Sequence, residues 1–184
     1  MFILYALPIG LLAGLLSGGR FAGLAELTFR WGWAIPAALL VQVILFSDQV
    51  TSWIGSAGPP IYVVSTAAVF LAVLANRATP GMPIVALGAA SNFAAIAANG
   101  GFMPADPDAL RVLGRVESTV YSNSAVVPDP QLAILTDLFA LPTWLPFANV
   151  FSVGDVLIGT GVAVVIAVAM RRPPLPAVGQ PAAA

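Results

Sequence analysis

Five long apolar stretches occupy much of the sequence, and almost every charged residue lies in the segments between them. The stretches cover residues 2–18, 31–47, 58–75, 82–98 and 153–170. With a rise of about 1.5 Å per residue, a helix of this length is just long enough to cross the hydrocarbon core of a membrane. The pattern therefore predicts an all-α, polytopic membrane protein with five transmembrane helices.

The charged residues are also sorted by sign along the chain. Five of the seven arginines lie beside alternate gaps between the stretches: Arg20, Arg30, Arg77, Arg171 and Arg172. Alternate threading leaves only Arg111 and Arg115 on the other side, together with every carboxylate except Glu26. Because basic residues in short loops stay in the cytoplasm, we expect a bacterial plasma-membrane protein with its N-terminus outside and its C-terminus inside.

Composition narrows the possible functions. The chain is 59% hydrophobic and only 8% charged, whereas about a quarter of a soluble domain is charged. A net charge of -1 supplies no basic field for nucleic acid. The chain has neither Cys nor His, and so lacks a thiolate nucleophile, an imidazole ligand and a general base suited to neutral pH. We expect no enzyme and no cofactor, while lipid or pigment at the helix faces remains an alternative.

The predicted organisation is one transmembrane domain, residues 1–172, followed by a Pro/Ala-rich tail, 173–184. Residues 99–152 form a partly ordered outer loop between the fourth and fifth helices. Within this loop, Asp106 and Pro107 can start a short helix. The apolar segments 132–141 and 144–147 can lie on the membrane surface or fold back over the bundle.

Small residues recur every four positions on the first predicted helix, at Gly10, Gly14 and Gly18. Such a row lets another backbone approach closely. It favours packing inside the five-helix bundle, and the alternative is a face that recruits another subunit.

Four predicted helices carry a polar residue roughly 10 Å from their outer ends. These residues are Gln42, Ser65, Asn92 and Thr160. We interpret them as one layer of interhelical hydrogen-bond partners, and the alternative is a site for a small polar solute. No ionisable residue accompanies them, which argues against an ion or proton pathway.

The last apolar stretch begins with a capping pattern. Ser152 can cap the helix while Asp155 in its first turn complements the positive helix end. The other aspartates on the outer side match no ion-binding loop, so we expect no metal site: Asp48, Asp106, Asp108, Asp129 and Asp137.

Several motifs together resemble a bacterial integral-membrane family known as domain of unknown function 5317. They are Gly18-Gly19-Arg20 with Glu26, Asn76-Arg77 with Pro80-Gly81, Asn99-Gly100-Gly101-Phe102-Met103-Pro104, Leu132 and Leu135 with Asp137, and Phe151-Ser152-Val153-Gly154-Asp155. Pro130-Gln131 departs from the threonine and basic residue expected there. The resemblance implies a membrane protein and supplies no activity. It marks Asn99, Gly100, Gly101, Met103, Pro104, Asp137 and Asp155 as a candidate outer-surface motif.

Two functional hypotheses follow from the sequence. The first is a non-catalytic accessory or scaffolding subunit of a larger membrane complex, with lipid and other membrane subunits as partners. The second is a small transporter, channel-like or lipid-binding protein that uses the polar layer around Gln42 and Asn92. An enzyme using Asp137 or Asp155 comes third, because no base accompanies these acids.

Overall fold

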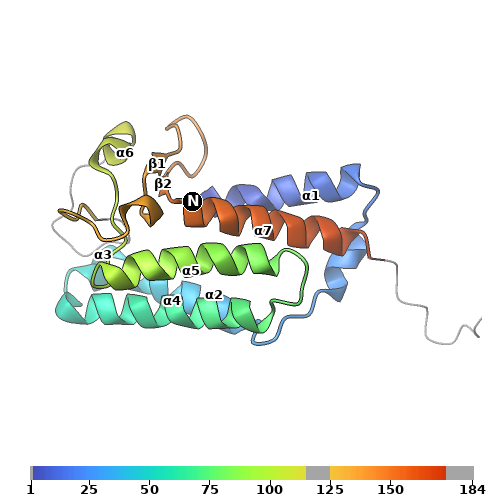
Figure 1. Cartoon of the computed structure of the whole chain (residues 1–184), viewed down its shortest axis with the longest axis horizontal. Coiled ribbons are helices and arrows are strands. Elements are labelled where there is room, and N and C mark those ends of the chain that lie inside the picture. Colours follow the sequence, from blue (N-terminus) through green and yellow to red (C-terminus); the bar gives the residue numbers. More distant parts are fainter. Residues whose placement is uncertain (1, 115–124, 173–184) are drawn as a thin grey trace, which may run out of the picture.

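The computed structural model describes residues 2–114 and 125–172, and the chain is mostly helical (Figure 1). Arg115 and the predicted tail 173–184 lie outside the described residues.

Five long helices form the body of the protein. Three of them coincide with predicted stretches: α4 (Gly58–Ala75), α5 (Met82–Ala98) and α7 (Val153–Met170). The first two are shorter than the predicted ranges 2–18 and 31–47. A 3-10 helix, η1 (Phe2–Tyr5), precedes α1 (Ala6–Leu16), and α2 spans Ala34–Leu45. Left-handed backbone at Trp31, with φ 54°, and at Gly18, with φ 78°, accounts for the late start of α2 and the early end of α1.

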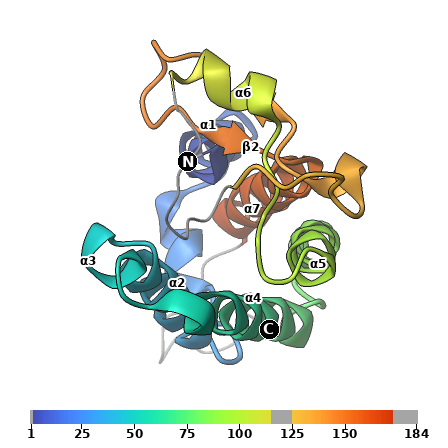
Figure 2. The same ribbon diagram turned by 90° about the vertical axis from the view of Figure 1, so that its left-hand side faces the viewer.

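The five helices pack in a row whose order differs from their order in the chain. Helix α7 packs between α1 and α5, α5 packs on α4, and α4 packs on α2. Viewed end-on, the row bends into an arc with α1 and α2 at its two ends (Figure 2). Helix α7, the last of the described helices, therefore lies inside the row, between the first helix and α5.

Close backbone approach between α5 and α7 depends on glycine. A Cβ added to Gly161 would stand 2.7 Å from the main-chain nitrogen of Val85, which is closer than real Cβ atoms come. At the neighbouring turn, a Cβ on Gly81 would stand 2.6 Å from the carbonyl oxygen of Gly161. The two helices thus touch backbone to backbone, as small residues permit in apolar bundles.

The ends of the bundle differ in charge. One end holds the 3-10 helix η2 (Phe21–Glu26), the turn between α4 and α5, and the end of α7 (Figure 1). We call it the arginine end, because these connections contain Arg20, Arg30, Arg77, Arg171 and Arg172. The opposite, aspartate end holds α3 (Asp48–Thr51), η3 (Gly55–Ala57) and the segment between α5 and α7. The charge sorting along the sequence is thus also a sorting in space.

The described part of the segment between α5 and α7 folds into a small cap with its own core. It contains α6 (Pro107–Val112), the 3-10 helix η4 (Ala133–Leu135), and strands β1 (Phe139–Ala140) and β2 (Val150–Phe151). The strands pair antiparallel, with Phe139 opposite Phe151, so the chain is not strictly all-α. The buried core of the cap contains Ala105, Ala109, Leu110 and Val150. Strands of two residues are too short to show an alternating pattern in the sequence.

Among the described residues, two helical segments are long and apolar enough to cross a membrane: Gly55–Ala75 and Val153–Met170. Their most apolar windows have mean hydropathies of 1.8 and 2.2. The other apolar helices, Phe2–Leu16, Ala34–Leu45 and Met82–Ala98, are shorter.

Candidate functional site

A closed ring of hydrogen bonds joins α5 to the start of α7. The Asn92 side-chain amide donates to Asp155 Oδ1 at 2.8 Å, and the Ser152 hydroxyl donates to Asn92 Oδ1 at 2.9 Å. The Asp155 main-chain N–H donates to the Ser152 hydroxyl at 3.1 Å, and the Ser152 N–H donates to Asp155 Oδ2 at 3.2 Å. We call Asn92, Ser152 and Asp155 the Asn92 cluster.

Local sequence explains why the Asn92 cluster forms. Ser152 is the N-cap of α7, and its reciprocal bonds with Asp155 make a capping box with aspartate in the glutamate position. Gly154 supplies the space, because a Cβ at this position would overlap Asn92 Oδ1. The Ser-Val-Gly-Asp sequence thus caps one helix and also receives a side chain from its neighbour.

The hydrogen-bond directions limit the chemistry of the Asn92 cluster. Ser152 is 0% exposed, and its hydroxyl proton points at an amide oxygen rather than at a carboxylate that could accept it. An activated serine needs an adjacent base within hydrogen-bond reach. The arrangement is therefore suited to holding helices together rather than to nucleophilic catalysis.

The predicted polar layer divides into separate places. Gln42 donates to the Ser65 hydroxyl at 3.2 Å between α2 and α4. Asn92 instead belongs to the cluster with Asp155, which the sequence placed in a different motif. Thr160 lies on the other side of α7, in a groove against α1. Similar depths along the helices did not bring these side chains together, because Asn92 faces α7 and Thr160 faces the α1 groove, away from the α2–α4 pair.

The predicted glycine row contacts α7. A Cβ on Gly10 would lie 2.9 Å from the Cα of Ala163, and one on Gly14 would overlap the Met170 side chain. Gly18 has open space around it and a φ of 78°, so it ends the helix rather than packing. Gly10 and Gly14 are therefore buried within this chain.

The candidate outer-surface motif lies at the aspartate end, but most of it is buried. Met103 and Asp137 are only 4% and 5% exposed. Pro104 is buried, and its carbonyl oxygen accepts a hydrogen bond from the Asp137 N–H at 2.9 Å. Gly101, with a φ of 89°, sits so close to Pro59 that a Cβ would be 2.6 Å from the Pro59 side chain. These residues attach the cap to the bundle and do not form an exposed surface.

Asn99 fixes the cap by binding main-chain groups. Its side-chain amide donates to the Ala95 and Gln131 carbonyl oxygens at 2.7 and 2.9 Å, and its Oδ1 accepts from the Gln131 N–H at 2.8 Å. Gly100, with a φ of 68°, turns the chain immediately afterwards. The contact with Gln131 was not evident from the sequence.

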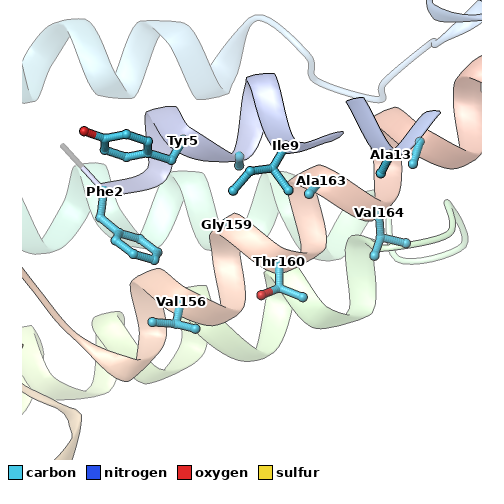
Figure 3. A pocket seen from close by; sticks show the side chains of 11 residues that line it. Phe2, Tyr5, Ile9, Ala13, Val156, Gly159, Thr160, Ala163 and Val164 are labelled. Atoms are coloured by element: carbon cyan, nitrogen blue, oxygen red, sulfur yellow. The ribbon is translucent and has the colours of Figure 1, made fainter. Parts of the chain in front are cut away.

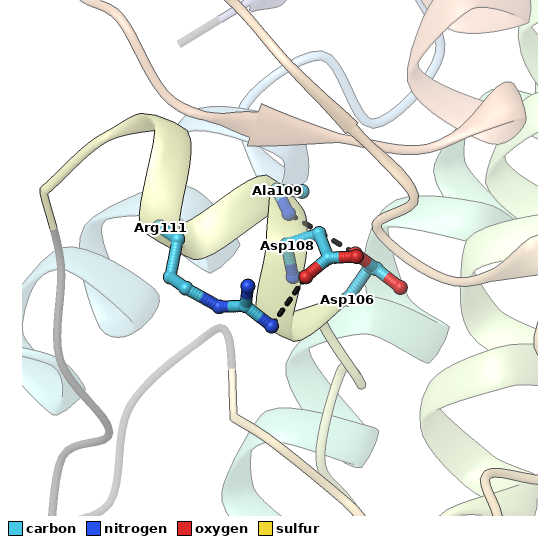
Figure 4. A network of polar contacts seen from close by, with 4 residues as sticks. All are labelled: Asp106, Asp108, Ala109 and Arg111. Atoms are coloured by element: carbon cyan, nitrogen blue, oxygen red, sulfur yellow. Dashed lines mark hydrogen bonds and ion pairs between the residues drawn. The ribbon is translucent and has the colours of Figure 1, made fainter.

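Asp106 and Asp108 have local structural roles (Figure 4). Asp106 Oδ1 accepts from the N–H groups of Asp108 and Ala109, which makes Asp106 the N-cap of α6. Asp108 forms an exposed ion pair with Arg111. Among the described residues, no group of three or more Asp, Glu, His or Cys side chains could hold a metal ion.

Two apolar grooves lie on the sides of the bundle. The groove between α1 and α7 has a volume of about 270 Å³ and is lined by residues that include Phe2, Tyr5, Ile9 and Thr160 (Figure 3). The groove between α2 and α4 has a volume of about 470 Å³, with Trp33, Val41 and Val64 in its lining. Both are hydrophobic surfaces along helices rather than enclosed polar pockets.

Comparison with known proteins gives one match. A family model described as a family of unknown function, DUF5317, matches residues 26–167. Neither a curated protein nor a solved structure matches the chain.

Proposed function

The chain belongs to this family of unknown function, and we propose that it is an integral membrane protein whose five long helices all span the bilayer. The main support is the position of the tryptophans. All four are exposed: Trp31 by 55%, Trp33 by 74%, Trp53 by 71% and Trp144 by 79%. The first two belong to the arginine end and the other two to the aspartate end. Tryptophan is enriched in this way at the two interfaces of a membrane.

The surface between the tryptophans is apolar. Exposed side chains include Leu12 and Leu16 on α1, Leu40 and Val43 on α2, and Leu87 on α5. Only 28% and 39% of the most apolar windows of α4 and α7 are buried in the protein, whereas a core helix of a soluble protein is mostly buried. At 18 residues each, α4 and α7 are about 27 Å long, close to the hydrocarbon thickness of about 30 Å.

Membrane topology can be tested directly because the chain has no cysteine. Single cysteines at Ser17, Gln49 and Ala78 would report on successive connections between helices. With the aspartate end outside, Gln49→Cys reacts with an impermeant maleimide on intact cells. Ser17→Cys and Ala78→Cys react only after permeabilisation. Labelling of all three in intact cells, or of none after permeabilisation, contradicts the five-span proposal.

Within the membrane, we propose a non-catalytic accessory or scaffolding role in a larger complex. The observation that carries this proposal is the Asn92 cluster, in which the asparagine, serine and aspartate side chains bind one another across two helices. The motifs that resemble the family make further contacts between segments, as Asn99 does with Gln131. The polar side chains of these motifs thus stabilise the shape of the protein, and a partner protein would recognise that shape.

Affinity purification in mild detergent tests the accessory role. A tagged chain should copurify from native membranes with one or more other membrane proteins in fixed ratio. Gly154→Ala, which places a Cβ against Asn92, should weaken that association together with the fold. Recovery of the native chain as a monomer without other proteins is the outcome that rules out this role.

The two grooves favour a second candidate function, the binding of lipid. Their linings are apolar, and each runs along a pair of helices. Native mass spectrometry would then show retained phospholipid that Ala163→Phe, in the α1–α7 groove, displaces. Equal lipid retention by the parent and Ala163→Phe proteins excludes a specific lipid at that groove.

A further inference from the structure

The cap contains an ordered hairpin that displays aromatic side chains. We define the Trp144 hairpin as residues 141–149, between β1 and β2. The pairing of Ala140 with Val150 continues into the hairpin, where the Leu141 N–H donates to the Asn149 carbonyl at 3.0 Å. At its tip, the Leu145 N–H donates to the Pro142 carbonyl at 3.0 Å. The tip therefore has a defined conformation.

This defined conformation exposes apolar surface. Trp144 is 79% exposed and Phe147 is 67% exposed. No charged residue lies between Asp137 and Asp155 in the sequence, so the hairpin offers no charge for recognition of a charged partner. Fixing large aromatic side chains in water is unfavourable, and an apolar or interfacial environment compensates for it.

Contacts with the first turns of the chain fix the position of the hairpin. The Tyr5 hydroxyl donates to the Pro146 carbonyl at 2.5 Å. The ring of Phe2 stacks on Phe151 with centroids 4.4 Å apart. The tip is thus held beside the start of α1, where an exposed apolar face begins with Leu4 in η1 and Leu7 in α1.

We propose that the Trp144 hairpin inserts into the lipid leaflet at the aspartate end and anchors the cap to the membrane surface. This inference rests on the proposed membrane location. Lipid is the occupant that the contacts favour, because the hairpin continues the lipid-facing surface of α1 at the level of the interface. Trp144 also matches the interfacial preference of its indole, which combines an apolar ring with an N–H donor.

Fluorescence of single-tryptophan proteins tests the inference. One protein keeps Trp144 and carries W31F, W33F and W53F, and its matched control keeps Trp53 and carries W31F, W33F and W144F. Both full-length proteins are placed in phosphatidylethanolamine and phosphatidylglycerol vesicles that contain lipid brominated near the carbonyl end of its acyl chains. We expect the brominated lipid to quench Trp144 strongly, and iodide to quench it several-fold less than in the unfolded protein.

The control separates failure of the inference from failure of the proposed function. Quenching of Trp53 by lipid, with Trp144 open to iodide, overturns the hairpin anchor and leaves the membrane proposal standing. If iodide quenches both Trp144 and Trp53 and the brominated lipid quenches neither, the proposed membrane location is wrong, and so is the hairpin anchor. Shielding of Trp144 in native membranes but not in the vesicles also overturns the anchor, since a protein partner would then cover the hairpin.

Discussion

The side chain of Asn76 binds both main-chain groups of Arg30. Its Oδ1 accepts from the Arg30 N–H at 2.8 Å, and its Nδ2 donates to the Arg30 carbonyl at 2.8 Å. The same amide donates to the Ala72 carbonyl at 2.7 Å. Asn99 binds Gln131 and Ala95 in the same way. Each asparagine is the first residue after a long helix, so two helix ends use one device to hold a distant segment.

Replacing Asn76 should destabilise the whole bundle. In Asn76→Ala, the Arg30 main-chain groups and the Ala72 carbonyl lose their hydrogen bonds to a buried side chain. Each group left unsatisfied costs about 1–3 kcal/mol of stability. Arg30→Lys should be close to neutral, because it keeps the charge and the main-chain groups that Asn76 binds. Thermal unfolding in detergent, followed by circular dichroism, measures the difference. Equal melting temperatures for the Asn76→Ala and parent proteins would show that the contact adds no stability.

Loss of the Asn99 contact should be local. We expect Asn99→Ala to accelerate amide hydrogen exchange in residues 131–136 with little effect on α4 and α7, because only the cap is released. Gln131→Ala keeps the bound main-chain groups and should exchange like the parent. Gln131→Pro removes the N–H that donates a hydrogen bond to Asn99 Oδ1, and it should resemble Asn99→Ala. Unchanged exchange in both Asn99→Ala and Gln131→Pro is incompatible with this account.

Two glycines in α7 should respond differently to alanine. Gly154→Ala pushes a Cβ into Asn92, and overpacking of this kind costs about 1–3 kcal/mol. A Cβ on Gly159 would lie 3.5 Å from Phe2 Cε1, an ordinary contact, so Gly159→Ala should change stability by less than about 1 kcal/mol. Melting temperatures of the two variants give the comparison. The reverse ranking would show that the Gly154 site can relax.

Asn92 and Asp155 should be energetically coupled. A double-mutant cycle with Asn92→Ala and Asp155→Ala should give an interaction free energy of about 0.5–3 kcal/mol, as is usual for side chains in one network. Gln42→Ala combined with Asp155→Ala should be additive to within about 0.5 kcal/mol, because Gln42 bonds to Ser65 whereas Asp155 bonds to Asn92 and Ser152. Denaturant unfolding in detergent supplies the free energies. Additivity in the Asn92 cycle would mean that the hydrogen bond contributes nothing.

The long helices could be predicted because their limits are local. Pro59 and Pro60 mark the start of α4, the turn at Pro80 and Gly81 precedes α5, and Ser152 with Asp155 starts α7. The shortening of α2 could not be predicted, because nothing in the sequence shows that Trp31 adopts a left-handed backbone. A tertiary environment selects such a conformation against local preference.

The candidate site could be predicted only in part. The capping box of Ser152 and Asp155 depends on residues three apart and was evident from the sequence. The third member, Asn92, was assigned to a layer with Gln42, because depth along a helix says nothing about which helices are neighbours. Asparagines directly after the predicted helices at 58–75 and 82–98 were a usable indication of contacts with distant segments. Their acceptors, Arg30 and Gln131, depend on the spatial order of the helices.

The packing of α1 against α7 sets an order of events during synthesis. The face of α1 that contains Gly10 meets Ala163 and Ile166, and these residues leave the ribosome more than 150 residues later. Until then the glycine face of α1 lacks the helix that it packs against in the folded protein. This glycine face therefore stays uncovered until α7 has been synthesised, and a factor that shields nascent chains would contact that face in the meantime. Helix α7 thus completes the packing of a helix made more than 150 residues before it.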